Sequence, residues 1–188
     1  MTARAGALII LLPALAIAEP AGAAQWTVDH AKSRLGFSVL WDREPFAGVF
    51  GRWYADIDFD PADLERARVT VRVDLASEHS DEADFDEGLK GALGFDVSKF
   101  AEAQFRATRI VHDGGDRYVA TGTLSLRGIT RPLTLPFTLT FTGTSAHMVG
   151  QAQVMRTEFG VGQGMWAAPQ PVAHQVTVTV DLTASKSQ

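Results

Sequence analysis

Apolar and polar residues alternate along most of the chain, and residues 121–141 show the pattern most clearly. Every second residue is apolar on both sides of segment 127–132, which has the composition of a turn. This period of two is typical of β-strands with one dry face and one wet face. The residues on the predicted dry face are Gly122, Leu124, Leu126, Leu133, Leu135, Phe137, Leu139 and Phe141.

The same alternation recurs in segments 34–41, 56–59, 69–75, 146–154 and 176–182. Short connections join many of these segments, and the sequence Asp113-Gly114-Gly115-Asp116 is a clear hairpin signal. Repeated alternating strands at short spacing predict an antiparallel sheet, arranged as either a sandwich or a barrel. We expect an all-β domain of about eight strands.

Two stretches lack the alternation and are predicted to be helical or irregular. Segment 61–67 begins with Pro61, which favours a short helical start there. Segment 80–100 is acidic at its beginning and predicts short helices and loop, with residues 87–95 as a candidate cover for the end of a barrel. Its carboxylates lack the EF-hand spacing of a calcium site and favour a helix N-terminus instead. Glycines at 160, 162 and 164 predict a turn near a barrel rim.

Residues 1–23 have the features of a secretory signal peptide. Arg4 precedes an apolar run over residues 7–18, and Ala21-Gly22-Ala23 provides a cleavage motif. The alternative is an uncleaved anchor, but the run is shorter than the roughly 20 residues that span a bilayer. We therefore predict an exported, periplasmic protein whose domain occupies residues 24–188.

Composition excludes several classes of chemistry. The net charge of −5, without a Lys/Arg-rich run, argues against nucleic acid as a partner. The absence of cysteine excludes thiolate metal sites, and the five histidines form no compact zinc motif. No G-x-S-x-G sequence is present. The sequence thus indicates no catalytic residue, no metal and no cofactor.

Aromatic residues are abundant, with 11 Phe and four Trp. Several, including Phe37, Trp41 and Phe105, fall on predicted inward faces, whereas Phe46 and Phe50 are predicted to lie outside regular strands. An eight-stranded barrel has an interior that is either just filled by side chains or able to hold one small ligand. The pattern alone does not choose between the two.

Several motifs, in order along the chain, resemble the YceI-like family. The opening Trp26-Thr27-Val28-Asp29 is similar to that of the family, as is Arg156-Thr157-Glu158-Phe159-Gly160, which matches an Arg-x-x-Phe-Gly motif. The other matching stretches are residues 33–37, 48–50, 57–60, 94–105 and 122–132. The resemblance runs from Trp26 to about Leu182.

This resemblance implies a single extended lipocalin-like barrel with short helices near one mouth, which holds a polyisoprenoid chain inside. The implied ligand is an isoprenoid lipid, either a polyprenyl quinone or a polyprenyl phosphate, and burial of its apolar tail would drive binding. The predicted lining residues are Phe37, Val39, Val71, Val73, Phe105, Leu124, Leu126, Leu135 and Phe137, with Phe95 as a lid residue.

The chain departs from the family pattern where the family often carries Arg-Asp-x-His-Leu. Here the stretch is Phe85-Asp86-Glu87-Gly88-Leu89, so both basic residues are missing. If those groups contact a head group, this protein prefers a less anionic ligand or binds no head group at all. Two alternatives stay open: a filled barrel that partners a membrane b-type cytochrome without a ligand, and an enzyme acting on a small apolar substrate. A homodimer is compatible with either.

Overall fold

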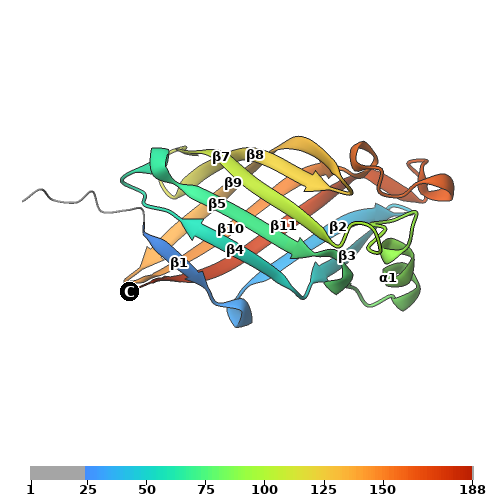
Figure 1. The fold of residues 1–188 in the computed structure, drawn as a ribbon, viewed down its shortest axis with the longest axis horizontal. Coiled ribbons are helices and arrows are strands. Elements are labelled where there is room, and N and C mark those ends of the chain that lie inside the picture. The colour runs from blue at the N-terminus through green and yellow to red at the C-terminus, as the bar shows by residue number, and fades with distance from the viewer. Residues whose placement is uncertain (1–23, 188) are drawn as a thin grey trace, which may run out of the picture.

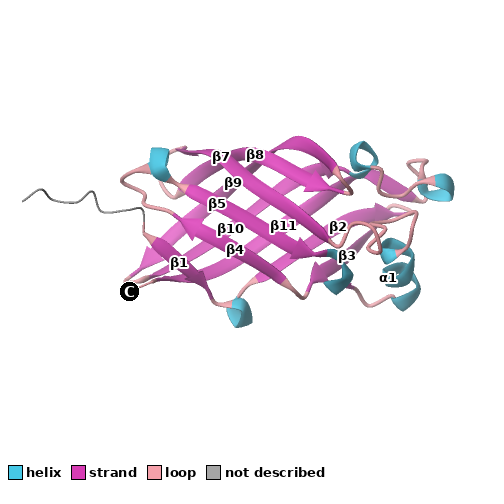
Figure 2. Ribbon diagram, in the orientation of Figure 1, coloured by secondary structure: helices cyan, strands magenta, loops and turns pink. Residues whose placement is uncertain are grey.

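The computed structural model describes residues 24–187, and strands make up most of this range (Figures 1 and 2). Within it, eleven strands form one antiparallel sheet, and no helix is long and apolar enough to cross a membrane. The predicted signal peptide, residues 1–23, lies outside the described residues. The strands are β1 (Gln25–Val28), β2 (Arg34–Trp41), β3 (Glu44–Phe50), β4 (Trp53–Asp58), β5 (Arg68–Asp74), β6 (Glu78–His79), β7 (Glu102–His112), β8 (Arg117–Leu126), β9 (Ile129–Thr142), β10 (Ser145–Met155) and β11 (Val172–Lys186).

The sheet closes on itself because β1 pairs with two strands. Trp26 is opposite Ile57 of β4 and also opposite Lys186 of β11. The ring therefore runs β1-β4-β5-β7-β8-β9-β10-β11 and back to β1. Closure removes the exposed sheet edges along this part of the barrel. The predicted all-β antiparallel barrel of about eight strands is confirmed.

The other three strands continue members of the ring toward one end. A 3₁₀ turn (His30–Lys32) separates β1 from β2, and Gly51 and Arg52 separate β3 from β4. Another 3₁₀ turn (Leu75–Ser77) separates β5 from β6. Beyond these breaks β2 pairs with β3, and β3 pairs with β6. The eight strands of the ring, three of which are continued after a break by β2, β3 and β6, thus form one elongated barrel (Figure 1).

Two details of the strand prediction are wrong. The turn expected over residues 127–132 contains only Arg127 and Gly128, whose φ values are 51° and 73°. Two positive φ values give the tight primed turn that suits twisted antiparallel strands, so β9 begins at Ile129. In addition, Phe46 and Phe50 belong to β3 rather than to a loop.

The missed strand β3 carries Gly48 at an inward position. A Cβ there would lie 2.6 Å from the Phe37 ring and 3.0 Å from Glu78 Oε1. Glycine therefore leaves room for two side chains from neighbouring strands. Because it also removes the apolar residue between Phe46 and Phe50, it hides the alternation of the strand.

Helical segments gather at the end of the barrel opposite the C-terminus (Figure 2). They are α1 (Ala83–Lys90) and two 3₁₀ turns, Arg156–Phe159 and Gly164–Trp166. Segment 80–100, predicted to form short helices and loop, contains one helix, α1, followed by loop. Segment 61–67 contains a single 3₁₀ turn, Leu64–Arg66, at the other end. The two ends of the barrel therefore differ: α1 and the two 3₁₀ turns lie at one end, and mainly strands and short connections lie at the other.

Candidate functional site

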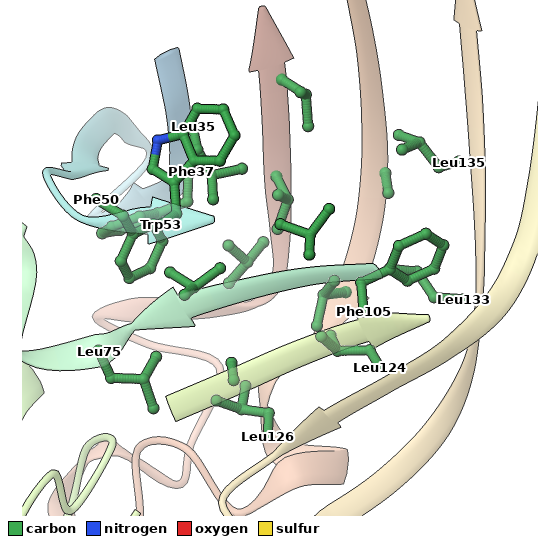
Figure 3. A pocket seen from close by; sticks show the side chains of 18 of the residues that line it. Leu35, Phe37, Phe50, Trp53, Leu75, Phe105, Leu124, Leu126, Leu133 and Leu135 are labelled. Carbon is green, nitrogen blue, oxygen red and sulfur yellow. The ribbon is translucent and has the colours of Figure 1, made fainter. Parts of the chain in front are cut away.

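The barrel encloses an elongated cavity of about 860 Å³. Every strand of the sheet except the two-residue β6 contributes to its lining, through the inward residues of the alternating pattern. Figure 3 shows side chains such as Phe37, Phe105 and Leu135 projecting into this space from different strands. The volume falls within the range of pockets that hold small ligands. The dry face of the strands therefore borders a cavity rather than a filled core.

The structure brings together the residues that the sequence singled out. All ten lie in the lining of the same cavity, and Phe95 is only 8% exposed although it lies outside the strands. Their contact with a ligand stays a prediction. The ten residues are Phe37 and Val39 on β2, Val71 and Val73 on β5, Phe95 after α1, Phe105 on β7, Leu124 and Leu126 on β8, and Leu135 and Phe137 on β9.

The end of the cavity far from α1 is wholly apolar. Trp26 and Phe59 pack there with Leu139 and Ala184 in a cluster of buried side chains. The indole N–H of Trp26 donates to the carbonyl oxygen of Phe59 at 2.9 Å, so its polar atom is satisfied within the protein. This end offers apolar surface but no free polar group to a ligand.

The other end of the cavity, which we call the mouth, carries a cluster of four aromatic rings. Trp41 lies with its ring centroid 5.5 Å from that of Phe85 and 5.4 Å from that of Trp166. Phe46 and Phe85 lie closer, at 4.0 Å. All four line the cavity. Because Phe85 comes from α1, this helix closes part of the mouth through aromatic contacts.

Arg156 orders the loop on the opposite side of the mouth. Its side chain lines the cavity and is 6% exposed. The guanidinium donates to six backbone carbonyl oxygens at 2.7–3.2 Å, and burial lowers the pKa of this group. The carbonyls belong to Val161, Gly162, Trp166, Ala168, Val172 and Ala173. Arg156 therefore fixes the segment between β10 and β11.

The predicted glycine turn at the rim lies in this loop. Gly160, Gly162 and Gly164 have φ values of 67°, 76° and 61°, in the left-handed region that favours glycine. A Cβ on Gly162 would also overlap the Arg156 guanidinium. The backbone N–H groups of Gly162 and Gln163 both donate to the Leu93 carbonyl oxygen, which ties this loop to the segment after α1.

The charged residues that line the cavity are all at the mouth. They are Arg156 and three exposed carboxylates, Glu44 at the start of β3 and Glu82 and Asp84 at the start of α1. The cavity is therefore asymmetric, with a long apolar interior and an acidic rim at one end.

Glu78 is a buried acid behind this rim, outside the cavity lining. Its residue exposure is 1%, and neither carboxylate oxygen has a hydrogen-bond partner. The Lys90 ammonium on α1 lies 4.0 Å away. Burial, assisted by the charge of Asp86, raises the pKa of Glu78 to about 7, and Lys90 opposes this rise. The group lies between the barrel wall and α1.

Sequence reasoning missed several residues of the site. Trp53 and Phe50 face the cavity at the break between β3 and β4, where the short strands showed little alternation. Arg156 was identified only as part of a family-like motif, and its spacing gave no indication of six carbonyl partners from an irregular loop. No pattern in the sequence predicts such partners.

Taken together, the closed antiparallel sheet and the internal apolar cavity define a barrel of the lipocalin-like class. The model of the YceI-like domain family matches residues 26–184, and the chain belongs to this family. Among curated relatives, a UPF0312 protein of Vibrio campbellii is 30% identical over 165 residues, which cover 79% of this chain and 84% of the relative. A UPF0312 protein of Shewanella baltica is 32% identical over 142 residues, covering 71% and 66%.

Solved structures agree with this fold. The crystal structure of Burkholderia cenocepacia BcnA matches with a TM-score of 0.82 and 28% identity, over 85% of this chain and 100% of that one. A polyisoprenoid binding domain from Saccharophagus degradans, implicated in plant cell wall breakdown, matches with a TM-score of 0.69. Its identity is 12% over 87% of this chain and 99% of that one, so this second likeness concerns the fold alone.

Proposed function

We propose that this protein binds the chain of an isoprenoid lipid in its barrel and carries it through the periplasm without chemical change. The observation that carries the proposal is the apolar cavity of about 860 Å³. An isoprenoid tail needs apolar area and shape but no hydrogen-bond partners, which is what the cavity provides.

Membership of the YceI-like family and the fold shared with a polyisoprenoid binding domain support the same ligand class. The signal-like residues 1–23 support the periplasmic location. Both alternatives raised by the sequence fit less well. A filled interaction module requires side chains that meet across the barrel axis, and an enzyme requires polar groups that converge inside. A cytochrome partner and a homodimer stay predictions.

The test uses a side chain that blocks the cavity. Ala152 is 4% exposed and lines the cavity midway along β10, whereas its neighbour Gln151 is exposed on the outside. We expect native mass spectrometry with added geranylgeraniol to show a one-to-one complex for the wild type and for the Gln151→Trp variant. The Ala152→Trp variant, folded by circular dichroism, should bind none. Equal binding by both variants would place the lipid outside the barrel.

A further inference from the structure

The two ends of the cavity differ in polarity, and this difference fixes the direction of a bound lipid. The far end, around Trp26 and Phe59, presents only apolar surface, whereas every charged lining residue is at the mouth. A polar head group buried at the far end would lose its water without gaining a partner. The head group therefore lies at the mouth, next to α1 and the loop of Arg156.

Most of the fixed charge that a head group meets there is negative. Glu44 reaches the rim from the β2–β3 hairpin, and Glu82 and Asp84 reach it from α1. All three are exposed. The first turn of α1 contains Asp84 and Asp86, whose negative carboxylates partly neutralise the positive end of the helix dipole. The N-terminus of this helix therefore attracts an anion weakly.

The single cation among the lining residues is not available to a ligand. A guanidinium has five N–H groups, and that of Arg156 already makes six hydrogen bonds to carbonyl oxygens, so at least one N–H is shared. Releasing any of them to a phosphate would leave buried carbonyls unpaired. Arg156 acts as a structural cation rather than an anion receptor.

Other cations next to the mouth include Arg127, Lys90 and Arg43. Arg127 donates to the carbonyl oxygens of Ala92 and Gly94 and lies over the Phe100 ring. Lys90 lies 4.0 Å from Glu78. Arg43 is exposed in the β2–β3 turn, where its sequence neighbours are Asp42 and Glu44. None of the three lines the cavity.

From this arrangement we infer that the mouth selects isoprenoids with an uncharged head group, such as a prenyl alcohol or quinone, and rejects prenyl phosphates. A phosphate monoester carries about −1.5 to −2 charges at pH 7, so it would face the three carboxylates with no free cation in the cavity lining to compensate its charge. Glu44, Glu82 and Asp84 are thus specificity-determining residues. The inference rests on the proposed function, because it assumes that the cavity holds the isoprenoid tail.

The experiment compares geranylgeraniol with geranylgeranyl monophosphate, two probes that share one tail and differ in the head group. Dissociation constants are measured for the wild type and for the triple variant Glu44→Gln/Glu82→Gln/Asp84→Asn. We expect the variant to bind the monophosphate about tenfold more tightly than the wild type and the alcohol equally well. The control is Glu87→Gln, an exposed acid of α1 outside the lining, which should change neither constant.

A second readout uses the wild type alone. High salt screens exposed charges, so it should reduce the difference between the dissociation constants of the alcohol and the monophosphate. An unchanged ratio of the two constants in the triple variant, or a wild type that prefers the monophosphate, would overturn the inference while leaving the proposed function intact. Failure of the wild type to bind either probe would instead overturn the proposed function.

Discussion

Two neighbouring residues at the mouth show how a loop without regular structure is held in place. Arg156 supplies donors to six carbonyl oxygens, and Gly162 leaves the space that its guanidinium occupies. Such a loop buries carbonyl groups that no strand or helix satisfies, so one charged side chain replaces the missing backbone partners. The wall of the mouth on this side depends on that pair.

Replacing Gly162 with alanine should destabilise the protein more than the same change at Gly160. Both positions have positive φ, which costs about 1–2 kcal/mol for a residue with a Cβ. At Gly162 the Cβ also overlaps Arg156, whereas at Gly160 it meets the end of the flexible Gln163 side chain at 3.1 Å. We expect Gly162→Ala to lower the free energy of unfolding by about 3 kcal/mol or more, as measured by urea unfolding. Equal losses would show that Arg156 moves freely.

Glu78 makes the stability depend on pH. Its pKa is about 7 in the folded protein and near the ordinary 4.5 when unfolded, because burial disfavours the charged form. The folded state therefore holds its proton more tightly. The contribution of this proton to the free energy of unfolding is complete below pH 4.5, falls as the pH rises, and is gone above about pH 7.

Glu78→Gln should remove this part of the pH dependence. Between pH 5 and pH 8 the free energy of unfolding of the wild type should fall by about 2–3 kcal/mol more than that of the variant, as measured from urea unfolding at each pH. The exposed Glu102→Gln on β7 serves as the control and should follow the wild type. A variant with the same pH profile as the wild type would mean that water or Lys90 already compensates the charge.

At the scale of elements, α1 packs over the mouth of the barrel without being part of its hydrogen-bonded sheet. It touches the barrel through Phe85 and Leu89, which line the cavity, and through the Lys90–Glu78 pair. The strands beside it are the short β3 and β6, which share only two registered residue pairs. We therefore expect a lipid to enter and leave between this helix and the Arg156 loop.

Phe85→Ala should speed the release of a bound lipid. The change removes the ring that packs on Phe46 and Trp41 but no backbone hydrogen bond, so the barrel should stay folded. We expect the dissociation rate of geranylgeraniol, followed by stopped-flow competition, to rise several-fold. Glu87→Ala, on the exposed side of the same helix, is the matched control. An unchanged rate for Phe85→Ala would assign the gate to another segment.

The sequence predicted the long elements well and the broken ones poorly. From Tyr118 to Leu126 in β8, and from Leu133 to Phe141 in β9, each inward position carries an apolar side chain or a glycine, so period-two alternation identified strands that line the cavity. In β3, Gly48 occupies an inward position because Phe37 and Glu78 need the space, which is a property of neighbouring strands. Nine of the ten predicted lining residues lie on strands, and Phe95 follows α1. Part of the mouth is built from α1 and the Arg156 loop, which alternation does not reveal.

On the scale of the whole molecule, the barrel is stabilised without disulfides although its axis is hollow. Buried side chains form one cluster at each half of the barrel, around Trp26 and Phe59 at the far end and around Leu75 and Phe159 toward the mouth. Side chains around the cavity lack packing partners on one side, which weakens their dispersion contacts. A tail in this space would restore those contacts.

Ligand should therefore stabilise the protein by mass action. At a free concentration of about 100 times the dissociation constant, geranylgeraniol should add about 2.7 kcal/mol to the free energy of unfolding. Calorimetry of the wild type should show the unfolding temperature rise with added lipid, whereas Ala152→Trp should show no rise because the new side chain blocks the cavity. The same shift in both proteins would indicate binding to the outer surface.

The most direct test of the central claim is native mass spectrometry of the protein purified from the cells that make it, without added lipid, followed by extraction and fragmentation of whatever is bound. We predict one bound molecule per chain, with the repeating fragments of an isoprenoid and an uncharged head group. A protein that is empty as isolated, and stays empty after incubation with prenyl alcohols and quinones, would contradict it.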